Sequence, residues 1–316
     1  MGITNWWQKF KKTTDITPPS VPTHKLKLGL ALSGGGTRGV AYIGVFRAFE
    51  EAGIKFDYVA GTSAGSLLGA AYCAGLSSKE IEEITTNIKA KDILTNKISF
   101  MPSKTEKMEI FIKQALKNKT FEDFSIPFTA VAVDIIKGEE LHITTGDIGK
   151  AIAGSCAFPG AFNPVDFGEK RLLDGGLMNN IPADVVREMG ADIVLAVDLN
   201  PTRGYGTDST KYLEVMKAAL RILMKSNSVN GYLYSDYVLK LDLSDFKQTK
   251  LEGVKEMIDL AYNITKQEIP NILKVLGMPN SDETIRQTTR RIKAMQKHTK
   301  IIERENKKLQ ETKNWR

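Results

Sequence analysis

Short apolar runs typical of buried strands alternate along the chain with segments whose apolar residues recur at helical spacing. This alternation favours a mostly parallel sheet covered by helices on both faces, a three-layer α/β/α sandwich. Gly138 suits a turn between two of the strands, and Ser77 with Glu80 fits a capping box. The predicted strands span residues 25–33, 56–63, 126–135, 139–145, 170–176 and 191–199, and the predicted helices span 39–53, 64–76, 78–88, 104–118, 147–158 and 182–190.

Composition changes mark both ends of this folded region. The proline-rich stretch Thr17–His24 has the composition of a linker, so residues 1–25 are expected to precede the body. From Ser281 the sequence is polar and basic with few apolar residues. We therefore predict an N-terminal segment over 1–25, one globular domain over 26–278 and a basic helical tail over 279–316.

The net charge of +7 belongs to the ends of the chain. Residues 1–27 hold five Lys and one Asp, and residues 281–316 hold eleven Lys and Arg against five Asp and Glu. The central residues are therefore mildly acidic, which argues against a nucleic-acid-binding core. Trp6, Trp7 and Phe10 share one helical face near several lysines, a pattern suited either to peripheral contact with an anionic membrane or to packing of the aromatic side chains on the protein body.

Targeting features are few. The N-terminus lacks the apolar core of a signal peptide, and the longest apolar run is too short to span a bilayer. We expect a cytoplasmic protein, with the N-terminal segment providing any contact with the inner face of the membrane. The two cysteines, Cys73 and Cys156, lie among small apolar residues and are expected to be buried thiols.

The glycine-rich stretch after the first predicted strand has two interpretations. Gly34, Gly36 and Gly39 fit the dinucleotide-binding pattern G-x-G-x-x-G, and the same backbone could instead donate N–H groups to an oxyanion. A nucleotide site needs an acidic residue at the end of the second strand. Asp57 precedes that strand, so a nucleotide-dependent oxidoreductase is disfavoured.

The second predicted strand ends instead in "GTSAG", which fits the nucleophile-elbow pattern G-x-S-x-G. Gly61 and Gly65 permit a tight strand-to-helix turn that presents Ser63. The helix that follows directs its positive N-terminus toward this serine. Ser63 is therefore the candidate nucleophile.

No histidine is well placed to activate this serine. His24 lies in the linker, His142 in a predicted strand and His298 in the basic tail. A carboxylate in a partly desolvated site can take the role of base, because burial raises its proton affinity. Asp174 ends an apolar strand and precedes two glycines, which makes it the candidate base.

Three segments in this order, "GGGTRG" (34–39), "GTSAG" (61–65) and "DGG" (174–176), resemble the patatin-like phospholipase family. The resemblance covers residues 26–199 and includes "GSCAFPGAF" (154–162) and "NNIP" (179–182). It implies a patatin-like fold and a Ser–Asp dyad of Ser63 and Asp174. It also implies an oxyanion hole, without a metal or cofactor, made by the amides of Gly34, Gly35 and Gly36 with Arg38 nearby.

The predicted function is that of a serine acyl hydrolase acting on carboxylic esters of lipids, of the phospholipase A, lysophospholipase or esterase type. The alternative is a non-catalytic or regulatory interaction protein on the same fold. Gly154 departs from the family, in which Ala is commoner before the serine, and this difference concerns packing only.

Overall fold

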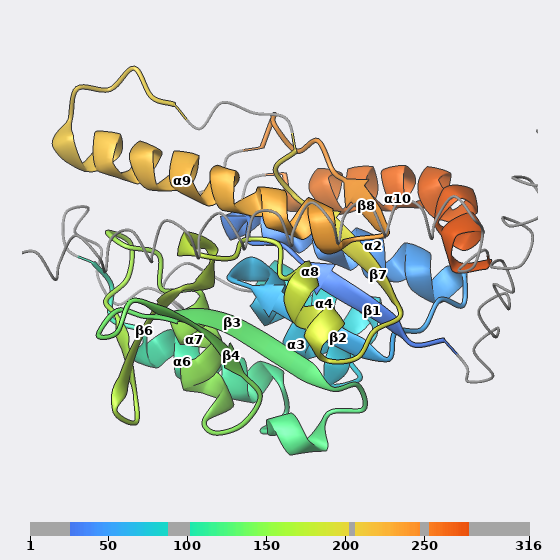
Figure 1. The fold of residues 1–316 in the computed structure, drawn as a ribbon, viewed down its shortest axis with the longest axis horizontal. Coiled ribbons are helices and arrows are strands. Elements are labelled where there is room, and N and C mark those ends of the chain that lie inside the picture. Colours follow the sequence, from blue (N-terminus) through green and yellow to red (C-terminus); the bar gives the residue numbers. More distant parts are fainter. Residues whose placement is uncertain (1–25, 88–101, 202–205, 247–252, 278–316) are drawn as a thin grey trace, which may run out of the picture.

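A computed structural model describes residues 26–87, 102–201, 206–246 and 253–277 of the chain (Figure 1). Strands and helices alternate through these residues. The strands are β1 (Leu28–Leu32), β2 (Tyr58–Thr62), β3 (Phe128–Asp134), β4 (Glu139–Ile143), β5 (Val165–Phe167), β6 (Lys170–Asp174), β7 (Ile193–Asp198) and β8 (Tyr237–Lys240). The α-helices are α2 (Ala41–Glu51), α3 (Ala64–Cys73), α4 (Ser78–Asn87), α6 (Glu106–Ala115), α7 (Ile148–Ser155), α8 (Ala183–Glu188), α9 (Tyr212–Tyr234) and α10 (Val254–Gly277). Short 3-10 helices are η1 (Gly36–Val40), η2 (Phe121–Asp123) and η3 (Gly175–Leu177).

The strands form one eight-stranded sheet with the order β5-β6-β3-β2-β1-β7-β8, and β4 pairs with β3 outside this path. The neighbours from β3 through β2, β1 and β7 to β8 run parallel. The strands β4, β5 and β6 pair in antiparallel fashion at one side of the sheet. The predicted mostly parallel sheet is therefore confirmed for the centre of the fold.

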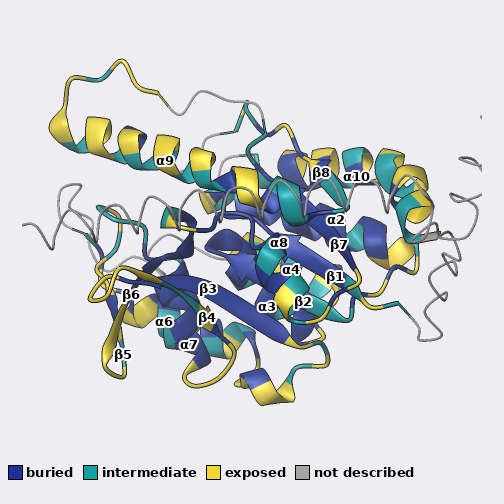
Figure 2. Cartoon of the chain, viewed as in Figure 1, coloured by how far each residue is buried: buried dark blue, intermediate teal, exposed yellow. Residues whose placement is uncertain are grey.

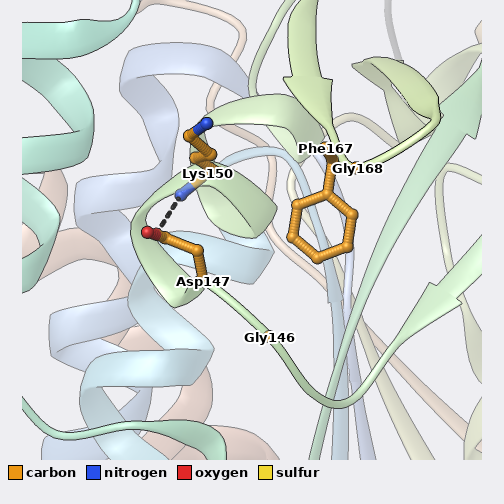
Figure 3. A pocket seen from close by; sticks show the side chains of 5 residues that line it. All are labelled: Gly146, Asp147, Lys150, Phe167 and Gly168. Carbon is orange, nitrogen blue, oxygen red and sulfur yellow. Dashed lines mark hydrogen bonds between the residues drawn. The ribbon is translucent and has the colours of Figure 1, made fainter.

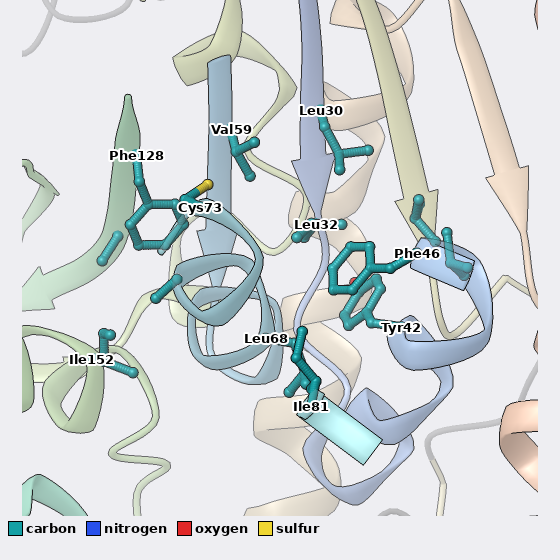
Figure 4. Packing of buried hydrophobic residues seen from close by; sticks show 14 of the residues in the cluster. Leu30, Leu32, Tyr42, Phe46, Val59, Leu68, Cys73, Ile81, Phe128 and Ile152 are labelled. Atoms are coloured by element: carbon teal, nitrogen blue, oxygen red, sulfur yellow. The ribbon is translucent and has the colours of Figure 1, made fainter. Parts of the chain in front are cut away.

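Successive side chains along the central strands point to opposite faces of the sheet and pack into two separate hydrophobic cores. On β1, Leu30 and Leu32 pack in the larger cluster with residues of α2, α3, α6, α7 and α10 (Figure 4). Ala31 points to the opposite face and packs with residues of α8. Because successive strand residues face opposite sides, helices on both faces are needed to bury them. Figure 2 shows this buried interior between exposed outer surfaces, which gives the predicted three layers.

Most local predictions agree with the structure. Ser77 N–H donates to Glu80 Oε2 at 2.9 Å and Glu80 N–H donates back to Ser77 Oγ at 3.3 Å, so the capping box is present. Gly138 has a φ of +70° in the turn between β3 and β4. The patterns did not predict β5, α9, β8 or α10. The ends of the chain, including both predicted terminal segments, lie outside the described residues.

Candidate active site

The site is built where two strands meet end to end along β3. β2 ends with Thr62 opposite Val131, and the antiparallel β6 ends with Asp174 opposite Ala132. β4 also pairs with Ala130 through Asp134, so it must occupy the other edge of β3. β2 and β6 therefore share one edge, and their carboxyl ends face each other across adjacent β3 residues, roughly 3.3 Å apart along the strand.

Ser63 follows β2 directly and has an unusual backbone conformation. Its φ of +52° and ψ of −121° are rare for a residue with a side chain and cost on the order of 1–3 kcal/mol. The turn closes so tightly that a Cβ at Gly61 would lie 2.3 Å from the carbonyl oxygen of Gly65. The turn thus requires glycine at position 61, and the close approach of β1 requires it at position 65, where a Cβ would lie 2.2 Å from the Leu32 carbonyl oxygen. Ser63 stands at the N-terminus of α3, as predicted.

Buried polar contacts hold this strained turn in place. The Ser63 N–H donates to Ser155 Oγ at 2.9 Å, and the Ser155 hydroxyl donates to the carbonyl oxygen of Val131 at 2.6 Å. The Thr62 hydroxyl donates to the carbonyl oxygen of Asn179 at 2.8 Å. The elbow is therefore tied to β3, to the end of α7 and to the loop that follows Asp174.

Asp174 reaches Ser63 from the facing strand end. The Ser63 hydroxyl donates to Asp174 Oδ2 at 2.8 Å, and the Gly176 N–H donates to Asp174 Oδ1 at 2.9 Å. The exposed fraction is 8% for Ser63 and 2% for Asp174. Burial raises the pKa of Asp174 to about 6, against the lowering effect of these hydrogen bonds. A carboxylate with this pKa is ionised at neutral pH and remains basic enough to accept a proton.

The glycine-rich loop lies against the serine. A Cβ at Gly34 would be 3.3 Å from Ser63 Cβ. The Gly34 N–H, however, donates to the carbonyl oxygen of Asn180 at 3.1 Å, which engages one of the three predicted oxyanion donors. Within the described part of the chain, the amides of Gly35 and Gly36 donate to no other residue. The geometry thus leaves two of the three predicted amide donors and removes Gly34.

Asn200 fixes the direction of one of these amides. Its side-chain amide donates to the Gly34 carbonyl oxygen at 2.9 Å. In a trans peptide the carbonyl and the following N–H point in opposite directions, so the Gly35 N–H is directed away from Asn200. Asn200 is itself held, because its own N–H donates to Asp198 Oδ1 at 2.8 Å.

Arg38 also acts on this loop through Asn200. Its Nη1 donates to Asn200 Oδ1 at 2.8 Å and its Nε donates to the carbonyl oxygen of Phe246 at 2.9 Å. The family resemblance implied only that Arg38 lies near the oxyanion hole. The contacts indicate in addition that the guanidinium fixes Asn200 and the loop around it.

His142 and Cys156 are two further titratable side chains whose pKa values are raised in the fold. His142 on β4 contacts Glu140 at 2.9 Å and Glu188 at 3.3 Å, and the hydrogen bond to Glu140 raises its pKa. His24 and His298 lie outside the described residues. Cys156 lies beside the site, and burial, followed by the charge of Asp174, raises its pKa to about 12. Its thiol is therefore neutral at ordinary pH.

Sequence reasoning missed the residues that support the dyad. Ser155, Asn180 and Asn200 are common polar residues, and no spacing rule marks them. Ser155 and Asn180 do fall inside segments that carried the family resemblance, which was the available signal. Gly154 is explained by packing, because a Cβ there would lie 2.6 Å from Leu172 Cβ.

A separate hollow of about 340 Å³ lies at the start of α7, lined by Gly146, Asp147, Lys150, Phe167 and Gly168 (Figure 3). Its aspartate caps the helix by accepting a hydrogen bond from the Lys150 N–H at 3.0 Å. None of the predicted site residues lines it. Over the residues that the structure describes, no cluster of His, Cys, Asp and Glu could hold a metal ion, and no helix is long and apolar enough to cross a membrane.

Comparison with known sequences identifies the family to which this chain belongs. The family described as Patatin-like phospholipase matches residues 30–187, half of the chain, including Ser63 and Asp174. The chain therefore belongs to the patatin-like phospholipase family.

Its relatives are larger proteins. An uncharacterised NTE family protein of Mycobacterium tuberculosis is 32% identical over 187 residues, which cover 57% of this chain and 32% of that protein. The lysophospholipase NTE1 of Mycosarcoma maydis is 33% identical over 220 residues, 61% of this chain and 11% of that protein. The chain thus spans about a third or less of these relatives. The fold is similar to that of VipD from Legionella pneumophila, with a TM-score of 0.52 at 14% identity over 78% of this chain and 67% of that one.

Proposed function

We propose that this protein is a serine acyl hydrolase that cleaves carboxylic esters of lipids. The observation that carries the proposal is the 2.8 Å hydrogen bond from the Ser63 hydroxyl to a buried Asp174 carboxylate whose pKa is raised to about 6. A nucleophile and a base within hydrogen-bonding distance are what acyl transfer requires. Membership in the patatin-like phospholipase family supports the same chemistry.

In the proposed reaction, Asp174 Oδ2 accepts the Ser63 proton while Oγ attacks the ester carbonyl carbon. The carbonyl oxygen becomes an oxyanion that accepts hydrogen bonds from the Gly35 and Gly36 amides. When the tetrahedral intermediate collapses, the alcohol leaves with the proton held by Asp174, and the acyl group stays on Ser63. Water then attacks the acyl-enzyme with Asp174 as base, which releases the carboxylic acid and restores the hydroxyl.

The surroundings of the dyad support this assignment of roles. The start of α3 directs its partial positive charge toward Ser63 and favours the developing negative charge. Asn200 and Arg38 act as positioning residues for the glycine loop. The Gly176 N–H holds the second oxygen of Asp174 and leaves Oδ2 to face the serine.

The substrate class is proposed from the family and from the lysophospholipase of Mycosarcoma maydis, whose matched region is similar to this chain. Phospholipase A, lysophospholipase and general esterase activities all use the same acyl transfer at the same dyad. We further propose a cytoplasmic protein that meets its substrate by peripheral membrane contact. The proposed catalytic unit corresponds to the predicted domain over residues 26–278.

The test is a lipid extract incubated with the parent protein and with Ser63→Ala, followed by mass spectrometry of the products. The parent should release free fatty acids together with the corresponding deacylated lipids, and Ser63→Ala should release neither. Ser66→Ala is the matched control, because its hydroxyl donates to the Ser63 carbonyl oxygen rather than to the base. A folded parent protein that leaves every lipid ester intact would favour the non-catalytic alternative.

A further inference from the structure

The side chain of Asn180 carries an oxygen that accepts no hydrogen bond from the residues that the structure describes. Its amide nitrogen donates to Ser228 Oγ at 3.2 Å, and the Ser228 hydroxyl donates in turn to the Met224 carbonyl oxygen at 3.1 Å. Because the one proton of that hydroxyl is already engaged, the nitrogen end of the amide faces α9 and Oδ1 is directed away from it. Asn180 is only 5% exposed, so this acceptor is expected to have a partner.

This oxygen lies between the glycine-rich loop and the loop that follows Asp174. A Cβ at Gly34 would be 2.6 Å from Asn180 Oδ1 and 3.3 Å from Ser63 Cβ. A Cβ at Gly176 would be 3.0 Å from the same oxygen and 3.1 Å from Asp174 Oδ1. Because each pair of atoms flanks one point, Asn180 Oδ1 lies no more than about 6 Å from an atom of each member of the dyad.

The surroundings of Asn180 Oδ1 leave it open toward the site. Over the described part of the chain, the fully buried side-chain oxygen that lacks a partner is Asn179 Oδ1, so Asn180 Oδ1 is less enclosed than its neighbour. On the α9 side the nearby group is apolar, since a Cβ at Gly176 would be 2.2 Å from the Met224 methyl carbon. A partner for this acceptor is therefore a water molecule or a hydroxyl group that enters the site.

The second half of the proposed reaction brings such a donor to this place. Once Ser63 is acylated, its oxygen carries no proton, so Asp174 Oδ2 loses the hydrogen bond of 2.8 Å that it accepts in the free protein. The attacking water can then donate one O–H to Asp174. Its second O–H also needs an acceptor, and holding both O–H groups fixes the direction of the lone pair that attacks the acyl carbon.

We propose that Asn180 is a further catalytic residue, whose side-chain oxygen holds the water that hydrolyses the acyl-enzyme. This inference rests on the proposed function and concerns the step that releases the acid. The water donates one O–H to Asp174 Oδ2 and the other to Asn180 Oδ1, and its oxygen attacks the acyl carbon. Asp174 takes the first proton and passes it to Ser63 Oγ as the ester bond to the serine breaks. The second proton stays on the water oxygen and leaves with the carboxylic acid.

Competition between water and methanol for the acyl-enzyme tests this role. Methanol has a single O–H, which Asp174 receives, so its attack does not use Asn180. Asn180→Ala should therefore slow hydrolysis by roughly tenfold, the effect of one hydrogen bond, and slow methanolysis much less. With p-nitrophenyl butyrate in buffer that contains methanol, the ratio of methyl butyrate to butyric acid should rise by roughly fivefold to tenfold. A merely structural loss would slow both reactions and leave this ratio unchanged.

Two further variants accompany this test. Asn180→Leu has a side chain of similar volume without an acceptor, so it keeps the space between the two loops filled and should raise the ratio as Asn180→Ala does. It replaces Asn180→Ala if that protein does not fold. Asn227→Ala is the matched control, because this asparagine ties α9 to the Leu177 carbonyl oxygen at 2.6 Å and should keep the product ratio of the parent.

A product ratio that stays at the parent value in a folded Asn180 variant would overturn this proposal, and so would an equal rise in Asn227→Ala. Thermal unfolding of each variant checks that the fold is retained. A parent protein that forms neither product would overturn the proposed function and this step together. A parent that forms both products in a ratio that Asn180 does not affect would overturn this step alone.

Discussion

The surroundings of Ser63 and the outer face of α9 depart from the usual distribution of side chains in opposite directions. Around Ser63, hydroxyl and carboxylate groups are buried, and Ser155 and Asp174 each find hydrogen-bonding partners. On α9, Ile222 and Leu223 are exposed although apolar. Folding alone favours neither arrangement, because a buried carboxylate is desolvated and an exposed apolar stripe gains no burial energy.

The comparison separates the buried residues proposed for the chemistry from a helix face that contributes none of them. Changes at Ser63 and Asp174 should therefore alter the turnover of a soluble short-chain ester. Changes on the outer face of α9 should leave that turnover unchanged.

The largest effect is expected for Asp174→Asn. An amide cannot accept the Ser63 proton, so kcat for a soluble short-chain ester should fall by roughly 100- to 10,000-fold, the contribution typical of a general base. The fold should be retained, since the Asn side-chain oxygen can still accept the hydrogen bond from the Gly176 N–H. Steady-state kinetics measure the turnover, and thermal unfolding checks that the fold is retained. If turnover remained within a few fold of the parent, Asp174 would not be the base.

A smaller loss is expected for Asn200→Ala, which removes the hydrogen bond to the Gly34 carbonyl oxygen. The Gly35 N–H would lose its fixed direction, and kcat should fall roughly tenfold with little change in KM. Asn271→Ala is the control, because this asparagine on α10 donates to Glu268 on the same helix and should leave kcat unchanged. A change in KM alone would place Asn200 in substrate binding rather than in positioning of the loop.

The pH dependence should follow the raised pKa of Asp174, about 6. The base must be ionised, so kcat/KM should fall as the pH drops below this value, by roughly tenfold for each further unit. Stability should move the other way through this group. Its folded pKa lies above the ordinary value of 3.8, so the folded state binds the proton more tightly and gains stability as the pH falls from about 6 toward 4. Rates and thermal unfolding across this range measure both trends, and a flat rate profile down to pH 5 would contradict the assignment.

The smallest effect on turnover is expected for His142→Gln. Its ring contacts Glu140 and Glu188, and the Ser63 hydroxyl donates to Asp174 instead, so ester hydrolysis should stay within about twofold of the parent. The pKa of His142 is raised in the fold, so its contribution to stability is present at low pH and fades as the pH rises through that pKa. His24→Ala and His298→Ala should also retain activity. If a folded histidine variant were as inactive as Asp174→Asn, that histidine would belong to a catalytic triad with Ser63 and Asp174, and the proposed dyad would be wrong.

The sequence was sufficient to predict the strands and α-helices from β1 to β7 except β5, and it singled out Ser63 and Asp174, whose side chains the fold brings within hydrogen-bonding distance. Strand and helix spacing differ clearly there, and the glycines of "GTSAG" and "DGG" mark turns that few other residues allow. What it could not predict is the pairing that places β6 on the same edge of β3 as β2. Strand partners are chosen by long-range packing, and that choice brings Ser63 and Asp174 together across 111 positions of sequence.

The C-terminal part was harder to predict for a different reason. Apolar residues occur on both sides of α9, since Leu213 and Met224 face the body while Ile222 and Leu223 face outward. Spacing alone therefore does not show which face is buried. Asn180 and Asn200 present a related problem, because their roles depend on backbone groups of Gly34 that approach only in the folded protein.

The most direct test of the central claim is to locate the covalent adduct that a fluorophosphonate forms with the full-length protein. Peptide mass spectrometry after digestion should find one modified residue, Ser63, with much slower labelling in Asp174→Asn and unchanged labelling in the α9 double variant Ile222→Glu and Leu223→Glu. An adduct on another serine, or a folded parent protein that is not labelled, would contradict the assignment of Ser63 and Asp174 as the catalytic pair.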